Sequence, residues 1–196
     1  MRFRMLRSRS AQAGTTMMEV LVSIVIVVIG LLGLAGLQSR ASVAEMEAFQ
    51  RAQAMVLLQD MSDRINANRK HAMEYVTAAP LGTGGTAPGS CAGLNGSARD
   101  LCEWENALLG AAESSGGLKV GAMIGARGCV AAINATMPRE MQIAVVWQGI
   151  VATAAPGATD CGSGQYGDEK TRRAITSNVI LGCLQNDLGT GLCVTP

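Results

Sequence analysis

Residues 14–37 read Gly-Thr-Thr-Met-Met-Glu-Val-Leu-Val-Ser-Ile-Val-Ile-Val-Val-Ile-Gly-Leu-Leu-Gly-Leu-Ala-Gly-Leu. From residue 20 to residue 37 this stretch has no charged side chain. A helix rises about 1.5 Å per residue, so such a run nearly crosses a hydrocarbon core of about 30 Å. One carboxylate, Glu19, lies at its N-terminal edge. The stretch predicts a membrane-spanning helix that carries everything after it.

Basic residues flank this apolar stretch on its N-terminal side. The arginines before Gly14 are Arg2, Arg4, Arg7 and Arg9, and no acidic residue accompanies them. Because basic flanks stay in the cytoplasm, we expect the chain beyond the apolar stretch to be exported. The whole chain has a formal net charge of +1, and the part after Gly14 has more acidic than basic residues. This balance gives no electrostatic reason to expect nucleic-acid binding.

The residues alone leave several interpretations of this N-terminus open. A secretory signal is cleaved beside small residues, but the small residues at 35–41 are interrupted by Leu37, Gln38 and Arg40. A plain anchor gives Glu19 no role, although an unpaired carboxylate at the edge of a spanning helix is costly. Glu19 could also lie in the headgroup zone, where the helix dipole favours an acid.

The order of basic leader, Gly14, Thr-Thr-Met-Met, Glu19 and unbroken apolar helix resembles the class III leader of type IV prepilins. In that family a peptidase cleaves after the glycine, and the glutamate becomes the fifth residue of the mature chain. The resemblance implies cleavage between Gly14 and Thr15, after which Glu19 pairs with a new α-amino group and sets the register of assembly. The family's usual first mature residue is phenylalanine, so Thr15 leaves N-methylation open.

Residues 18–38 and 60–69 look most like the PilV group of minor pilins. The resemblance implies a minor pilin that helps to initiate a type IV pilus and supports adhesion and twitching motility. Its implied partners are the prepilin peptidase, other minor pilins, the major pilin and the inner-membrane assembly platform. Before assembly it would span the inner membrane once, with its head in the periplasm, and afterwards it would lie in the pilus.

Two other functions are compatible with the same residues. A pseudopilin of a type II secretion system shares the N-terminal pattern, and neighbouring genes would distinguish it from a pilin. A membrane protein with one spanning helix and an exported enzyme or binding domain would keep its N-terminus at Met1.

The sequence divides into a leader (residues 1–14), an apolar half-helix (15–40), and an amphipathic half-helix with an exported α+β head (41–196). No proline occurs between Thr15 and Ala79, so one helix over about residues 15–75 is predicted, ended by Pro80. Met55, Leu58, Met61 and Ile65 recur at helical spacing and predict the face that packs on the head. The charged Asp60, Asp63 and Arg64 are assigned to the opposite face.

Gly30, Gly33 and Gly36 recur every third residue in the apolar half-helix. Glycine costs a helix about 1 kcal/mol relative to alanine, so some benefit must offset it. Small residues let neighbouring helices approach closely. We interpret the three glycines as a packing face for other helices.

The head predicts one short helix and several strands. The helix is expected at residues 98–110, with Leu101, Trp104 and Leu108 on one side. Strands are expected at residues 118–124, 129–135, 140–151 and 174–184, and polar loops at 82–97 and 155–173. One long helix followed by strands predicts an α+β, pilin-like fold with an antiparallel sheet packed on the helix.

The cysteines follow the apolar stretch, as expected for disulfides in an oxidising compartment. They are Cys91, Cys102, Cys129, Cys161, Cys183 and Cys193. Six cysteines allow fifteen pairings, and sequence proximity favours only Cys91–Cys102.

We expect no enzymatic activity, cofactor or metal. The only histidine, His71, falls near the predicted helix end beside Arg69 and Lys70, where a solvated side chain is expected. No phosphate-binding glycine motif appears. Trp104 and Trp147 are assigned to the core, and Arg172-Arg173 to the start of a strand.

Overall fold

The structure is a computed structural model that describes residues 14, 16–85, 88–110, 114–115, 118–119, 123–136 and 139–182. The chain divides into two compact units, Met1–Ala44 and Glu45–Pro196. The first contains the N-terminal part of a long helix. The second, which we call the head, contains the rest of that helix and all the strands.

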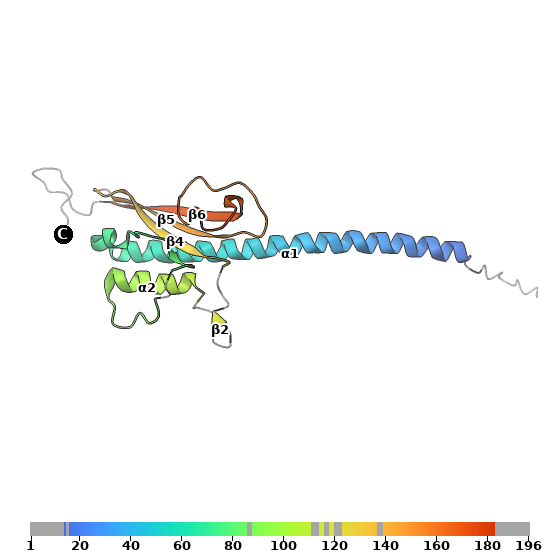
Figure 1. Ribbon diagram of the computed structural model, residues 1–196, viewed down its shortest axis with the longest axis horizontal. Coiled ribbons are helices and arrows are strands. Elements are labelled where there is room, and N and C mark those ends of the chain that lie inside the picture. Colours follow the sequence, from blue (N-terminus) through green and yellow to red (C-terminus); the bar gives the residue numbers. More distant parts are fainter. Residues whose placement is uncertain are drawn as a thin grey trace, which may run out of the picture. The chain divides into compact units, whose positions relative to one another are not determined.

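The long helix α1 runs from Met17 to Ala67 (Figure 1). Thr16 begins it, because the Glu19 N–H donates to both the Thr16 carbonyl (3.0 Å) and the Thr16 hydroxyl (3.3 Å). The helix ends earlier than predicted. After Ala67 the chain tightens into the 3₁₀ segment η1 (Arg69–Tyr75), interrupted by the non-helical dihedrals of His71. The His71 N–H donates to the Asn68 carbonyl, which closes the first tight turn.

The head contains a four-stranded antiparallel sheet in the order β1-β4-β5-β6. Its strands are β1 (Leu81–Gly82), β4 (Arg127–Asn134), β5 (Arg139–Gln148) and β6 (Arg172–Leu181). A separate pair joins β2 (Ser114–Ser115) to β3 (Leu118–Lys119). The three long strands confirm three of the predicted strands with shifted ends, whereas the fourth, predicted at 118–124, is described only as the two residues of β3.

Met55 was wrongly included in the predicted packing face, because its side chain is 48% exposed and Ala54 is buried instead. The face of α1 that packs on the sheet otherwise follows the predicted helical spacing. Its buried apolar residues in the head are Ala54, Leu58, Met61 and Ile65. Across from them, β5 turns alternate residues inward, namely Met141, Ile143, Val145 and Trp147. The expected α+β fold, with a long helix packed on an antiparallel sheet, is therefore confirmed.

The helix α2 (Gly96–Leu108) closes the same core from a side of α1 different from that of the sheet (Figure 1). The Trp104 side chain is fully buried, and its Nε1–H donates to the Leu57 carbonyl of α1 at 2.9 Å. A Cβ built on Gly128 of β4 would lie 2.2 Å from the Trp104 ring. The glycine therefore leaves the room that the indole fills.

The outer face of the sheet is covered by the loop of residues 149–171. Cys161 of this loop is bonded to Cys129 of β4, and Ala144, Val146 and Tyr166 form a small second core with Cys161. Arg172, which is buried, donates to the Pro156, Thr159 and Cys161 carbonyls and pairs with Glu169 at 2.6 Å. These contacts fix the loop on the strands below it.

The structure also contains the Cys91–Cys102 disulfide, which fastens the loop before α2 to that helix. Sequence proximity favoured this pair, but nothing in the sequence indicated Cys129–Cys161. Cys183 and Cys193 lie outside the described residues.

Replacing Gly128 with alanine should destabilise the head, because the new methyl group overlaps a tryptophan that the core holds in place. We expect G128A to lower the free energy of unfolding by about 1–3 kcal/mol, measured by urea denaturation in detergent micelles. The matched control is G157A, whose Cβ meets nothing within 4 Å. It should change stability by less than about 0.5 kcal/mol. Equal midpoints for the two variants would contradict the packing described.

Removing Cys129–Cys161 should cost more than removing Cys91–Cys102. The two bonds span 32 and 11 residues of sequence, and a longer closed loop restricts the unfolded chain more. We expect C129A/C161A to lose about 2–4 kcal/mol and C91A/C102A to lose less, by the same denaturation measurement. The reverse order would show that loop length does not govern these bonds.

Candidate functional site

The N-terminal end of α1 presents the predicted cleavage and register residues. Gly14 is exposed, Thr15 lies outside the described residues, and Glu19 occupies the first turn of α1. Glu19 is exposed, and its carboxylate makes no ion pair with any described residue. The cleavage and register roles of these residues stay predictions.

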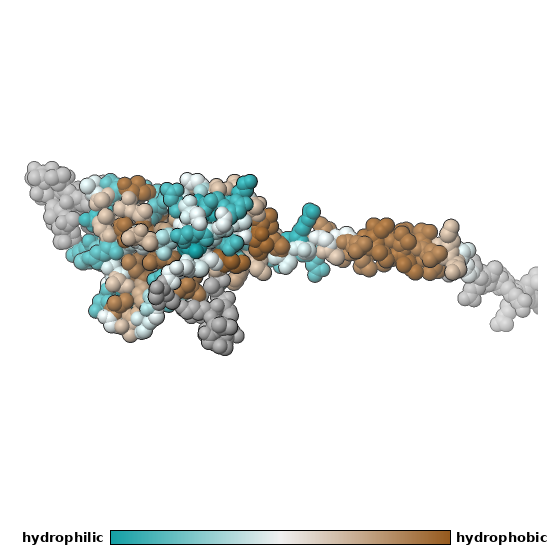
Figure 2. Space-filling view, in the orientation of Figure 1, coloured by the Kyte–Doolittle hydropathy of each residue, from teal (hydrophilic) through white to brown (hydrophobic). Residues whose placement is uncertain are grey.

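Residues 20–37 of α1, which follow Glu19, have no charged side chain on any face of the helix. The helix contains one window of residues that is long and apolar enough to cross a membrane, with a mean hydropathy of 3.0 and no residue buried within the protein. Large side chains along it, such as Leu21, Ile26 and Leu34, are half or more exposed. Figure 2 shows the resulting unbroken apolar surface on the N-terminal part of α1. Such a surface fits membrane anchoring, followed by burial among other helices.

Gly30, Gly33 and Gly36 lie within this apolar surface. All three are helical and exposed, and a Cβ added at any of them would meet nothing within 4 Å. Among the described residues, therefore, no neighbour requires these positions to be glycine. Packing against other helices remains the prediction for them.

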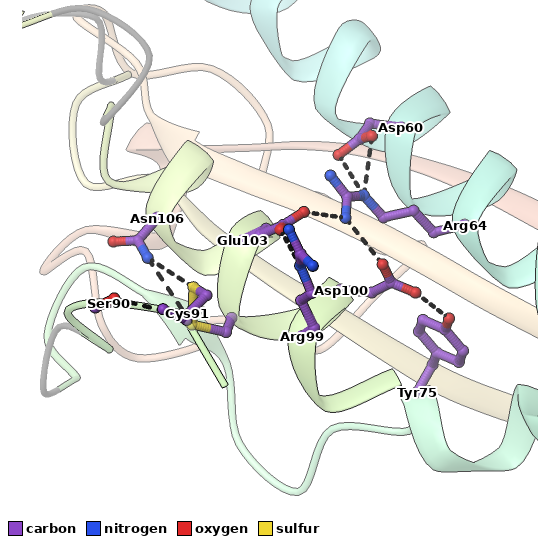
Figure 3. A network of polar contacts seen from close by, with 11 residues as sticks. Asp60, Arg64, Tyr75, Ser90, Cys91, Arg99, Asp100, Glu103 and Asn106 are labelled. Carbon is purple, nitrogen blue, oxygen red and sulfur yellow. Dashed lines mark hydrogen bonds and ion pairs between the residues drawn. A yellow bond between two sulfur atoms is a disulfide. The ribbon is translucent and has the colours of Figure 1, made fainter. Parts of the chain in front are cut away.

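A network of charged side chains joins the end of α1 to α2 (Figure 3). At its centre is the half-buried Arg64 of α1, whose Nε contacts Asp60 at 3.0 Å. Its Nη1 contacts Asp100 at 3.0 Å and Glu103 at 2.8 Å, both from α2. Arg99 adds a second cation to Glu103 at 2.7 Å. One guanidinium thus holds three carboxylates from two helices in a single arrangement.

Tyr75 extends this network to η1. Its hydroxyl donates to Asp100 and accepts from the Asn68 side chain at 3.2 Å. Burial and the hydrogen bond to Asp100 raise the pKa of Tyr75 to about 12, so its hydroxyl keeps the proton that it donates. Hydrogen bonds from Arg64 and Arg99 hold the pKa of Glu103 below its ordinary value. The network therefore fixes where α1 ends and η1 begins.

Sequence reasoning missed this network. It assigned Arg64 to the side of the helix opposite the apolar face and gave it no partner, but the structure turns Arg64 toward α2, where its side chain is only 25% exposed. The spacing of Asp60 and Arg64 is that of a helical ion pair, and Asp100 and Glu103 lie on adjacent turns of one helix face. Those two spacings were the available signal. Their meeting depends on the packing of α2 against α1, which no local pattern encodes.

The other charged residues singled out in the sequence have structural contacts. His71 is exposed and contacts Glu74 at 2.8 Å within η1. Arg172 and Arg173 are the first residues of β6, and both are tied to loop carbonyls. The described residues contain no group of three or more histidine, cysteine or acidic side chains that could hold a metal ion. Both tryptophans are buried, as predicted.

The lowered pKa of Glu103 predicts how stability depends on pH. Its stabilising contribution is fully present above the ordinary glutamate pKa of about 4.3, and is lost as the pH falls through the lower folded-state value. We expect E103Q to be less stable than the wild type at pH 7, with the difference vanishing near about pH 2. Urea denaturation across this range measures it. E45Q, on an exposed residue without an ion pair among the described residues, is the control. A difference that stays constant with pH would contradict the assignment.

Comparison with known proteins identifies one protein family whose model matches part of the chain. Residues 36–106 match the model of the Tt1218-like family, described as type IV pilin Tt1218. The match covers less than half of the chain. It includes the Arg64 network and the Cys91–Cys102 bond, and it leaves Glu19 outside. No curated protein and no solved structure matches the chain. With the long apolar helix and the disulfide-bonded antiparallel head, the match supports a type IV pilin, a structural rather than an enzymatic kind of protein.

Proposed function

We propose that the protein is a minor pilin of a type IV pilus, made as a prepilin whose leader is cleaved between Gly14 and Thr15. The observation that carries the proposal is the exposed Glu19 in the first turn of an apolar helix, followed by residues 36–106, which match a type IV pilin family. The similarity of residues 18–38 and 60–69 to the PilV group favours a minor subunit over a major one.

Glu19 acts in this proposal through its charge. Cleavage after Gly14 creates an α-amino group at Thr15, and a carboxylate near the edge of the apolar region is most stable beside such a cation. Because Glu19 has no ion-pair partner among the described residues of its own chain, the amino group of a neighbouring subunit can supply it. The pairing then fixes how far one helix advances past the next.

The apolar half of α1 has two successive environments in this proposal. It first spans the inner membrane, with the head in the periplasm, and later packs among the helices of the fibre. Gly30, Gly33 and Gly36 let those helices approach. The head is displayed on the pilus, where the subunit supports initiation, adhesion and twitching motility together with other minor pilins. Before it enters the fibre, the subunit interacts with the prepilin peptidase and with the assembly platform of the inner membrane.

N-terminal sequencing of the protein from the membrane fraction tests the leader. We expect the mature chain to begin at Thr15. A terminus at Met1, or one near Ala41, would be incompatible with prepilin processing.

Replacing Glu19 tests the register role. We expect E19Q to be cleaved normally but to reach sheared pili at about one tenth of the wild-type level or less, because an unpaired terminal charge in the fibre costs more than 1.4 kcal/mol. Immunoblots of pilus and membrane fractions give the ratio. E45Q, on an exposed α1 residue, should assemble normally. Normal assembly of E19Q would remove the register role.

Deletion of the whole protein tests whether the subunit is minor. We expect few pili and a smaller twitching zone, although the protein itself forms only a small fraction of sheared wild-type fibres. If the protein is instead the dominant band of those fibres, it is a major pilin.

A further inference from the structure

The apolar contact between α1 and the rest of the head begins only at Ala54. Within residues 45–53, which we call the latch segment, the single buried side chain is Gln50. From Ala54 onward, buried apolar residues follow on every turn of the same face. The latch segment therefore adds no buried apolar side chain of its own to the core.

Two buried polar atoms beneath and beside the latch segment have no hydrogen-bond partner among the described residues. Gln50 is 4% exposed and its Oε1 is unpaired. Trp147 of β5 is 3% exposed and its indole Nε1 is unpaired. Burying a polar group without a partner is unfavourable, so these atoms oppose the docked position of the latch segment.

Glu47 supplies the contacts that hold this segment in place. Its Oε1 accepts from the Ile150 N–H at 3.0 Å and from the Val151 N–H at 3.3 Å. Arg173 of β6 pairs with the same carboxylate at 3.2 Å. Partial burial alone would raise the pKa of Glu47, but the hydrogen bonds from Val151 and Arg173 lower it. The docked position of the latch segment therefore favours the ionised carboxylate of Glu47.

An open groove of about 340 Å³ runs beside these contacts. Glu47, Ala48 and Arg51 line it from α1, and Trp147, Arg173, Ala174 and Ile175 line it from the sheet. The latch segment therefore borders an unfilled space instead of a closely packed surface, and little van der Waals contact is lost when it moves.

We propose that the latch segment is a conformational device, which detaches from the head as a unit while the core from Ala54 onward stays intact, and that Glu47 keeps it closed. Detachment moves the point where α1 leaves the head by about two helical turns. When the latch segment is docked, α1 contacts the rest of the head from residue 45 onward. When it is detached, this contact begins at Ala54, and the helix that is free of the head is longer. This inference concerns the head alone and does not depend on the proposed pilin role.

Hydrogen exchange of the full chain in detergent micelles tests the device. A helix freed from the head keeps its own hydrogen bonds but opens more often, because no contact with the head holds it closed. We therefore expect E47A to speed amide exchange within residues 45–53 about tenfold and to leave residues 54–67 and the strands unchanged. Q50L should slow exchange in the same peptides, because it extends the apolar face by one turn and removes the unpaired amide oxygen. The double variant E47A/Q50L should lie close to the wild type.

The control is E45A, which removes an exposed acid from the same segment and should leave its exchange unchanged. Unchanged exchange in E47A would overturn the role of Glu47. Equal acceleration across residues 45–67 would show that the helix opens only with the whole head, and faster exchange in Q50L would show that Gln50 stabilises the docked state. Either result would overturn the device. None of these measurements requires pilus assembly. Their outcome is therefore independent of whether the proposed pilin function is correct.

Discussion

The head depends on the burial of one narrow face of α1 between a sheet and a second helix. The apolar residues of that face are separated by three or four positions, so α1 can contribute only one stripe to the core. The indole of Trp104 widens the contact, because it bonds α1 through the Leu57 carbonyl and fills the space over Gly128. The sheet and α2 are both positioned by their contact with this face.

Two sets of charged contacts lie at the two ends of this stripe. The Arg64 network joins α1 to α2 where the helix ends, and Glu47 joins α1 to β6 and the loop after β5 where the apolar contact begins. Both use a carboxylate and a guanidinium, but α1 has buried apolar residues beside Arg64, namely Met61 and Ile65, whereas its buried residue near Glu47 is the polar Gln50. The two ends of the same interface therefore differ in how easily they open.

The sequence predicted the parts of this fold that depend on local pattern. The unbroken apolar run, the spacing of Leu58, Met61 and Ile65, and the amphipathic stretch around Trp104 each describe one element, and each element is found. Local patterns of this kind do not predict which elements contact each other. The contacts of Arg64 were missed because α2 supplies two of its carboxylate partners. The Cys129–Cys161 bond was missed because its loop gains a fixed position only over the finished sheet. The early end of α1 at Ala67 likewise follows from the contact of Asn68 and Asp100 with Tyr75.

Arg172 has a consequence for how the exposed loop can evolve. Its guanidinium binds the loop through the main-chain carbonyls of Pro156, Thr159 and Cys161, which are groups that every amino acid possesses. Together with the Cys129–Cys161 bond, these contacts specify the path of the loop without specifying most of its side chains. Substitutions at the outward positions of residues 150–160 can therefore accumulate at small cost to stability. The same property makes this loop a suitable place to graft a foreign peptide or epitope.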